Sequence, residues 1–255
     1  MSKIKKNYIY VDVSITENSP HRTGIQRVVR EFCDHFKKNT KDNLVIKYIN
    51  VNKVSISEND DPLMNATNFI DFKVKINNFI NSIRRSIFVM LPERIATKIS
   101  AITTRYFRIK NLYKNLVVKD NYDTHTLLLI DSNWTRDALI LSKLFQNDGH
   151  KIVSVFYDLS PIIEPDYFEK GVAKNFKNYW VAQLEYSDLI LSISKTISNE
   201  LKSYVKKTNW HTKKNIKYDF INRLIKEILE RSYFLNIYSF KSILIVRNGF
   251  DQGYD

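Results

Sequence analysis

Short runs of β-branched and other large apolar residues recur along this chain, and they constrain its fold more than any other feature. Most are separated by segments whose apolar residues repeat at helical spacing, so strands and helices are expected to alternate. Runs that are apolar throughout are typical of strands covered on both faces, as in a parallel sheet. The sequence therefore predicts one α/β domain with a Rossmann-like, doubly wound parallel sheet. The six candidate strands are Tyr8 to Val13, Leu44 to Ile49, Thr126 to Ile130, Ile152 to Phe156, Leu189 to Ile193 and Ser242 to Val246.

The segment that begins at Gly24 carries a clear helix pattern. Its apolar residues fall at the spacing of one helix face, while Arg27 and Arg30 lie off that face. We expect this helix to pack on the sheet through that face. The apolar positions are Ile25, Val28, Val29, Phe32 and Phe36.

Two segments depart from the simple alternation and are interpreted as helical insertions into a domain that covers residues 1–255. The first, Asn68 to Lys119, holds eleven basic and two acidic residues, which is +9 of the chain's +13. An apolar stripe from Phe69 to Phe88, followed by Pro92, predicts a basic helical hairpin whose second helix runs towards Leu112. The second segment, Lys206 to Phe240, is expected to precede the last strand.

The charge of +13 favours an anionic partner without choosing among nucleic acid, phosphorylated substrates and lipid headgroups. Cys33 is the only cysteine in the sequence, so an intrachain disulfide is excluded. No segment has the length and apolarity of a membrane-spanning helix, and the amino terminus makes a poor signal peptide. We expect a cytoplasmic protein, peripheral to the inner face of the plasma membrane, on which the basic hairpin would lie. The alternative is that the hairpin only covers the sheet.

The motifs of several common cofactor sites are absent. The sequence contains no G-x-G-x-x-G, no Walker A loop and no C-x-x-C, and its five histidines lack metal-ligand spacing. Dinucleotide, P-loop and zinc sites are therefore not expected, and neither a cofactor nor a metal is predicted. The candidate ligand positions that remain are the carboxyl ends of the strands.

Three strand ends carry candidate site residues. Thr23 and Gly24 open the first helix, where free N–H groups favour a phosphate; the alternative is a plain strand-to-helix turn. Tyr157 and Asp158 follow the fourth candidate strand, and Asp158 either orients or deprotonates a hydroxyl or caps the next turn. Ser194 and Lys195 follow the fifth, where a helix cap and a solvated lysine are the alternatives.

Taken together, these strand ends resemble the amino-terminal half of bacterial glycosyltransferases of family 4, of the kind that build O-antigen and capsular polysaccharides. The matching blocks follow the family's order between residues 8 and 251, and both insertions match poorly. The blocks are Val11 to Ser14, Arg22 to Arg30, Leu129 to Trp134, Tyr157 to Pro161, Pro165 to Phe168, Ser187 to Lys195 and Val246 to Asp251.

The resemblance implies a GT-B enzyme that retains the anomeric configuration without a metal, with this chain as the acceptor-binding half. The substrates would be a sugar nucleotide and a saccharide acceptor that is lipid-linked. Thr23 and Gly24 would face the donor diphosphate, with Arg27 adding charge. Asp158, the candidate catalytic residue, and Tyr157 would contact the acceptor hydroxyl. Ser194 and Lys195 would line the same edge. The first and fourth candidate strands are expected to flank the switch point of the sheet, so that Thr23 and Gly24 form one wall of a substrate site and Tyr157 and Asp158 form the opposite wall.

This chain departs from the family's pattern because it ends at Asp255, four residues after the last matching block, so the donor-binding half has no counterpart. We expect a fragment, a truncated product, or half of a split enzyme completed by a separate donor-domain chain. The isolated chain is then expected to be inactive. A non-catalytic subunit is one alternative. A basic nucleic-acid-binding domain is another, but it leaves the ordered blocks unexplained, so nucleic acid is not an expected partner.

Overall fold

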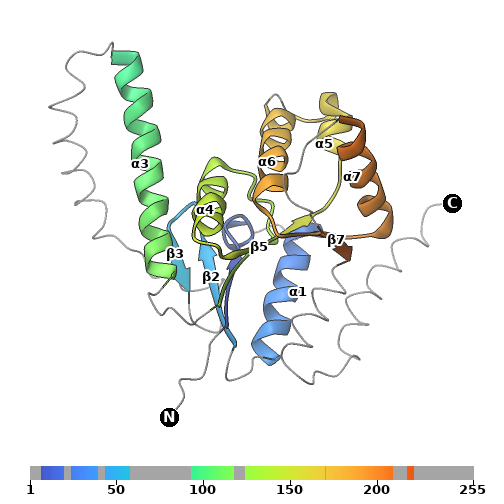
Figure 1. Cartoon of the computed structure of the whole chain (residues 1–255), viewed down its shortest axis with the longest axis horizontal. Helices are drawn as coiled ribbons and strands as arrows, with labels where there is room; N and C mark the ends of the chain where they lie inside the picture. Colours follow the sequence, from blue (N-terminus) through green and yellow to red (C-terminus); the bar gives the residue numbers. More distant parts are fainter. Residues whose placement is uncertain are drawn as a thin grey trace.

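Seven strands form one sheet in the computed structural model (Figure 1), which describes residues 7–19, 24–39, 44–57, 93–117, 124–169, 171–208 and 217–220. The strand order is β3-β2-β1-β4-β5-β6-β7, and every neighbouring pair is parallel except β2 and β3. The strands are β1 (Asn7–Asp12), β2 (Leu44–Asn50), β3 (Ser55–Ser57), β4 (Thr124–Leu129), β5 (Lys151–Phe156), β6 (Leu189–Ser192) and β7 (Lys217–Phe220).

The direction in which successive strands are added reverses between β1 and β4. From β1 the chain adds β2 and β3 on one side, and from β4 it adds β5, β6 and β7 on the other. A reversal of this kind is the switch point of an open α/β sheet, where ligands bind beyond the carboxyl ends of the strands. The expected α/β class with a mostly parallel sheet is confirmed, and the topology is compatible with a Rossmann-like fold.

Helices cover both faces of the sheet. Helix α1 packs on one face, while α3, α4 and α6 pack on the other. This division follows from right-handed crossovers, which place a helix on opposite faces when the chain moves in opposite directions along the sheet. The helices are α1 (Gly24–Asn39), α3 (Glu93–Leu116), α4 (Arg136–Asn147), α5 (Ser160–Ile163), α6 (Val172–Tyr186) and α7 (Lys195–Thr208).

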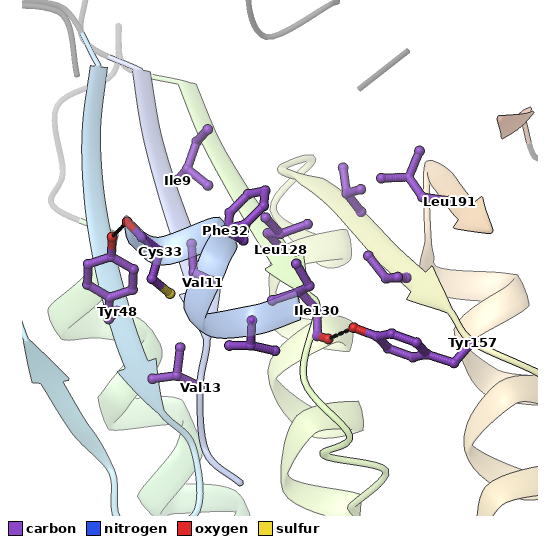
Figure 2. Close-up of a cluster of buried hydrophobic side chains, with 13 residues drawn as sticks. Ile9, Val11, Val13, Phe32, Cys33, Tyr48, Leu128, Ile130, Tyr157 and Leu191 are labelled. Atoms are coloured by element: carbon purple, nitrogen blue, oxygen red, sulfur yellow. Dashed lines mark hydrogen bonds between the residues drawn. The ribbon is translucent and has the colours of Figure 1, made fainter. Parts of the chain in front are cut away.

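The face under α1 is an apolar cluster drawn from alternate residues of the strands (Figure 2). Val11 and Leu128 point from neighbouring strands towards Phe32 and Cys33 of α1, as the two-residue period of a strand requires. The Tyr48 hydroxyl donates to the backbone carbonyl of Cys33 at 3.2 Å. The helix pattern from Gly24 therefore has the predicted orientation.

The opposite face uses the intervening strand residues. Tyr10 and Leu127 are fully buried there, in contact with a cluster that contains Leu112 of α3 and Phe145 of α4. Farther along the sheet, Trp180 of α6 is 2% exposed and packs edge-on against Phe156, with ring centroids 4.6 Å apart. Because both faces of the sheet are covered by apolar side chains, the central strands appear in the sequence as continuous runs of apolar residues.

Five of the six candidate strands are present, with ends shifted by at most two residues. The sixth, Ser242 to Val246, lies outside the described residues, as does the expected first helix of the basic hairpin with its apolar stripe from Phe69 to Phe88. Two strands were not expected. β3 is a three-residue edge strand. β7 extends the sheet and lies inside the segment interpreted as the second helical insertion, Lys206 to Phe240, of which the structure describes residues 206–208 and 217–220.

Within the described part of the chain, no helix combines the length and the apolarity needed to cross a membrane.

Candidate functional site

The best-organised polar cluster lies where the chain leaves β1 and β4. These strands pair in parallel, with Val11 opposite Leu128, so their carboxyl ends open at the same edge of the sheet. Asp12 is the last residue of β1, and Asp131 follows β4 by two residues. Both carboxylates are buried, at 1% and 5% exposure. They therefore stand side by side at the switch point, where an open α/β sheet binds its ligands.

Asp131 holds the loop that follows β1. Its Oδ2 accepts hydrogen bonds from the backbone N–H groups of Ile15 and Thr16 at 2.8 and 2.7 Å. Its Oδ1 accepts from the Thr16 hydroxyl at 3.0 Å and from the backbone N–H of Ser132 at 2.7 Å. Four donors from the protein satisfy this carboxylate, so its role is to fix the loop.

Asp12 is held from both sides of the switch point. Its Oδ1 accepts from the backbone N–H of Ser14 at 3.0 Å and from the Ser14 hydroxyl, and its Oδ2 accepts from Asn133 Nδ2 at 2.9 Å. Burial, followed by the nearby Asp131 charge, raises the pKa of Asp12 to about 7, although the bonds from Ser14 and Asn133 oppose this rise. Asp12 therefore exchanges a proton near neutral pH, whereas an ordinary aspartate does not.

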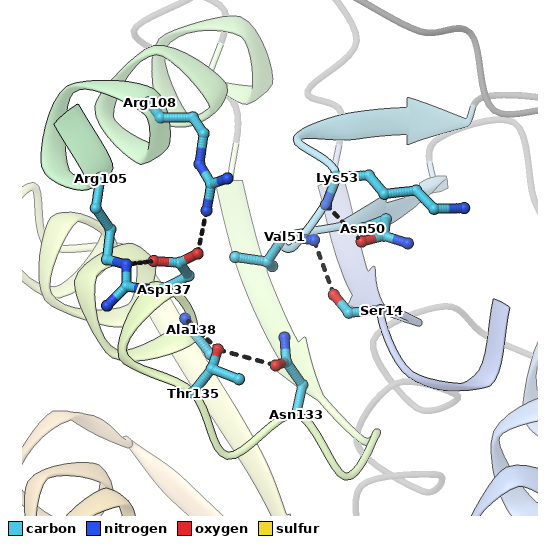
Figure 3. A network of polar contacts seen from close by, with 10 residues as sticks. All are labelled: Ser14, Asn50, Val51, Lys53, Arg105, Arg108, Asn133, Thr135, Asp137 and Ala138. Atoms are coloured by element: carbon cyan, nitrogen blue, oxygen red, sulfur yellow. Dashed lines mark hydrogen bonds and ion pairs between the residues drawn. The ribbon is translucent and has the colours of Figure 1, made fainter. Parts of the chain in front are cut away.

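The network extends to neighbouring elements (Figure 3). The Ser14 hydroxyl accepts from the backbone N–H of Val51, after β2, at 2.8 Å. Asn133 Oδ1 accepts from the Thr135 hydroxyl at 2.9 Å, and Thr135 caps α4 by accepting from the N–H of Ala138 at 3.3 Å. The ends of β1, β2 and β4 and the start of α4 thus form one hydrogen-bonded unit.

Arg30 of α1 completes the support of the loop after β1. Its Nη2 donates to the backbone carbonyls of Thr16 and Ser19 at 3.1 and 3.0 Å. Within the loop, Asn18 Nδ2 donates to the carbonyl of Ser14 at 2.7 Å. The chain that leads into α1 is therefore held by contacts from α1 and from within the loop, in addition to those from Asp131.

Asp158 is half-buried just beyond β5, and its Oδ1 accepts from the backbone N–H of Ser160 at 2.9 Å. This contact closes an Asx turn just before the short helix α5, and capping of the next turn is one of the two roles expected from the sequence. A carboxylate that is partly exposed at a strand end can also accept a hydrogen bond from a bound hydroxyl.

Tyr157 does not have the expected position. Its side chain belongs to the core under α1 and is 6% exposed, and its hydroxyl donates to the carbonyl of Ile130 at 2.5 Å (Figure 2). Burial raises the pKa of the Tyr157 phenol. The expectation that Tyr157 contacts an acceptor is therefore corrected. The Tyr157 side chain follows the apolar strand β5 and packs in the core instead.

The residues expected to bind phosphate are only partly described. Gly24 is exposed at the start of α1, and a Cβ added there would meet no atom within 4 Å. The exposed Arg27 pairs with Glu31 one turn later on the same helix, at 2.8 Å. Thr23 lies outside the described residues.

Ser194 and Lys195 follow β6, the neighbour of β5. Phe156 is paired with Ser192, so Asp158 and Ser194 each lie two residues beyond paired strand ends. The Ser194 hydroxyl accepts from the N–H of Ile197 at 3.1 Å, which is a cap of α7, and Lys195 is exposed. The edge of the sheet thus brings Asp158 and Ser194 together.

Gly24 and Asp158 are not on neighbouring strands. The sequence predicts that β1 and β5 flank the switch point, with the residues after them forming opposite walls of one site. In the structure, β4 lies between β1 and β5. The error has a physical origin, because the switch point is set by the return of the chain from β3 to the other side of β1, and no local pattern specifies that return.

The sequence motifs gave no role to Asp12, Asp131 or Asn133, which belong to two of the matching blocks. The signal that could have identified them is an acidic residue at the carboxyl end of an apolar run, because two such ends meet at a switch point. Among the described residues, no group of three or more histidine, cysteine, aspartate or glutamate side chains is placed to hold a metal ion.

Comparison with known proteins gave no further information: no protein-family model, no curated protein and no solved structure matches this chain.

Proposed function

We propose that this chain is the acceptor-binding domain of a GT-B glycosyltransferase of the family 4 type, acting on a saccharide acceptor that is lipid-linked. The observation that carries the proposal is where the matching blocks lie. Four of them, which contain Asp12, Asp131, Asp158 and Ser194, fall at the carboxyl ends of β1, β4, β5 and β6. This edge is the ligand-binding edge of an open parallel sheet.

In this proposal the acceptor hydroxyl is bound by Asp158, beside Ser194 and Lys195 on the next strand end. An ionised carboxylate at this point accepts the hydroxyl's hydrogen bond and directs its oxygen towards the donor sugar. Tyr157 has no place in this site, because its hydroxyl is bonded inside the core.

The sugar nucleotide is proposed to approach the start of α1. Open space beside Gly24 leaves its backbone accessible, and the first N–H groups of a helix favour a diphosphate. The hydrogen bonds from Asp131 and from Arg30 of α1 hold the loop after β1 beside this helix. The polar network at the switch point thus positions this part of the site.

The experiment compares Asp158→Asn with Asp166→Asn, an exposed carboxylate in the same connection. The amide introduced by Asp158→Asn keeps an oxygen to cap Ser160 but loses the negative charge, so folding is expected to persist. Binding of polyprenyl-linked saccharides is measured by calorimetry. Transfer is measured from a panel of sugar nucleotides, with the chain alone and with a separately expressed GT-B donor domain.

We expect transfer to fall by roughly 100-fold or more in Asp158→Asn and to be unchanged in Asp166→Asn, because loss of a group that orients or deprotonates a hydroxyl has effects of this size. Unaltered transfer in Asp158→Asn would refute the role of this residue. If no saccharide acceptor binds and single-stranded nucleic acid binds instead, the proposal as a whole fails.

A further inference from the structure

The amino-terminal half of α3 carries a stripe of exposed apolar side chains. Ile95, Ile99, Ile102 and Tyr106 are 47%, 40%, 59% and 39% exposed. Their spacing of four, three and four residues places them on one face of the helix. Isolated exposed apolar residues are common on proteins, but a continuous row of them marks an interaction surface.

The same row continues into the core. Ile109, Tyr113 and Leu116 extend the spacing of three and four residues, and each is buried against the sheet and α4. One end of α3 is thus packed, while its amino-terminal end stands away from the sheet (Figure 1). Because the helix is continuous from Glu93 to Leu116, the packed end fixes the direction in which the exposed stripe faces.

Two of the basic residues of α3 already have a structural role. Arg105 Nε lies 2.9 Å from Asp137 Oδ1, and Arg108 Nη2 contacts Asp137 Oδ2, so both guanidinium groups attach α3 to the first turn of α4 (Figure 3). Arg94 and Lys98 are exposed beside the stripe. Lys110 Nζ lies 5.8 Å from the centre of the Tyr106 ring.

The charge of α3 is one-sided, with six basic residues and one acidic residue, Glu93. An anionic partner complements such a helix, whereas a second copy of α3 would bring like charges together. Isoleucines flanked by lysine and arginine, with a tyrosine in the same row, are typical of a helix that lies in the interface of a bilayer.

We propose that the exposed half of α3, from Arg94 to Tyr106, docks on an anionic lipid surface. Ile95, Ile99 and Ile102 enter the boundary between headgroups and acyl chains, and Arg94 and Lys98 contact the anionic headgroups. The inference is independent of the proposed glycosyltransferase function, and it concerns a segment outside the blocks on which that function is argued.

The first test measures co-sedimentation with vesicles of phosphatidylglycerol and phosphatidylcholine, and with vesicles of phosphatidylcholine alone. A basic residue near an anionic surface contributes about 1 kcal/mol, so the double variant Arg94→Gln with Lys98→Gln is expected to bind anionic vesicles at least about tenfold more weakly. The matched control is Lys174→Gln with Lys177→Gln, two lysines of α6, which is expected to bind like the unmodified chain.

The second test locates the contact. Cys33 is the only cysteine and is buried, so a polarity-sensitive dye on Ile99→Cys reports that position alone. The dye emission is expected to shift to shorter wavelength with anionic vesicles, and not with neutral ones. Val181→Cys on α6, where the valine is 44% exposed, serves as the control and is expected to show no shift.

Circular dichroism confirms that each variant is folded before binding is compared. Equal binding to neutral and anionic vesicles would overturn the proposal, as would unchanged binding of the Arg94→Gln with Lys98→Gln variant. Sedimentation equilibrium tests whether the stripe binds a second copy of the chain instead. A dimer that dissociates in the Ile99→Gln variant would show this and would overturn the proposal.

Discussion

At the residue scale, the two buried aspartates of the switch point differ in their surroundings. Asp131 accepts four hydrogen bonds, two of them from consecutive backbone N–H groups, whereas Asp12 accepts three and lies beside the Asp131 charge. Burial of a carboxylate favours its neutral form unless donors compensate. Asp12 is therefore the member of the pair whose pKa is raised, to about 7.

The raised pKa of Asp12 predicts how stability depends on pH. Its pKa lies at about 7 in the folded protein, above the ordinary value of 3.8, so the folded state binds this proton more tightly than the unfolded state. Its contribution to the free energy of unfolding is complete below about pH 4. It decreases by up to about 1.4 kcal/mol per pH unit as the pH rises towards about 7.

Urea unfolding of the unmodified chain and of Asp12→Asn at several pH values checks this prediction. The variant has no proton to lose, so the decrease between about pH 4 and about pH 7 is expected to become shallower. Asp166→Asn, at an exposed position, should leave it unaltered. A pH dependence that is identical in the unmodified chain and Asp12→Asn would show that Asp12 titrates normally.

Site residues were harder to predict from the sequence than strands, because the direction of a side chain changes from one residue to the next after a strand ends. Tyr157 and Asp158 are adjacent in sequence at the end of β5, yet one side chain enters the core and the other reaches the edge of the sheet. The direction of each depends on how the chain turns after the strand. Strand periodicity predicts which residues are buried within a strand, but it does not predict the direction of a side chain beyond the end of the strand.

At the element scale, α3 joins the core to the exposed stripe, and ion pairs to one carboxylate add to the apolar contacts that attach it. Asp137 is buried in the first turn of α4, where a negative charge is favourable, and it receives both Arg105 and Arg108. The sequence predicted a helix that starts at Pro92, as part of a basic hairpin expected either to lie on the membrane or to cover the sheet. It gave no sign that two of these arginines would be used for packing, because their partner lies on another element, far along the chain.

Asp137→Asn is expected to weaken both ion pairs while keeping the shape of the side chain. Because the two arginines are partly exposed, we expect the free energy of unfolding to fall by only about 1–2 kcal/mol. Amide hydrogen exchange in the carboxyl-terminal half of α3 should become faster. Glu31→Gln, which removes the exposed pair with Arg27, should cost less than about 0.5 kcal/mol. Equal effects of the two substitutions would contradict this account of how α3 is attached.

The strands that were and were not anticipated differ in their sequences. β1, β4, β5 and β6 are covered on both faces, so each leaves a run of apolar residues in the sequence. β3 has only three residues and pairs through its backbone at the edge of the sheet, and β7 includes lysine and aspartate. An edge strand is specified by its neighbour's unpaired backbone groups as much as by its own side chains, so its sequence carries little signal.

At the scale of the whole molecule, the two faces of the sheet share their strands. β1 contributes Val11 to the cluster under α1 and Tyr10 to the cluster on the opposite face. In the same way, β4 contributes Leu128 to the first cluster and Leu127 to the second. A cavity on one face therefore loosens strands that also support the other. Because its two faces share their strands, we expect the described α/β domain to open as one cooperative unit.

The thiol of Cys33 tests this cooperativity because it is the only cysteine, it is 3% exposed, and it lies on α1. Leu141→Ala removes a fully buried side chain of α4 on the far face and is expected to cost about 2–5 kcal/mol. If the sheet opens as one unit, the rate at which a thiol reagent labels Cys33 rises by the same factor as the unfolding equilibrium constant. Ile102→Ala, at an exposed position of α3, leaves the rate unchanged. Should Val29→Ala on α1 speed labelling while Leu141→Ala does not, α1 would detach alone and the two faces would be independent.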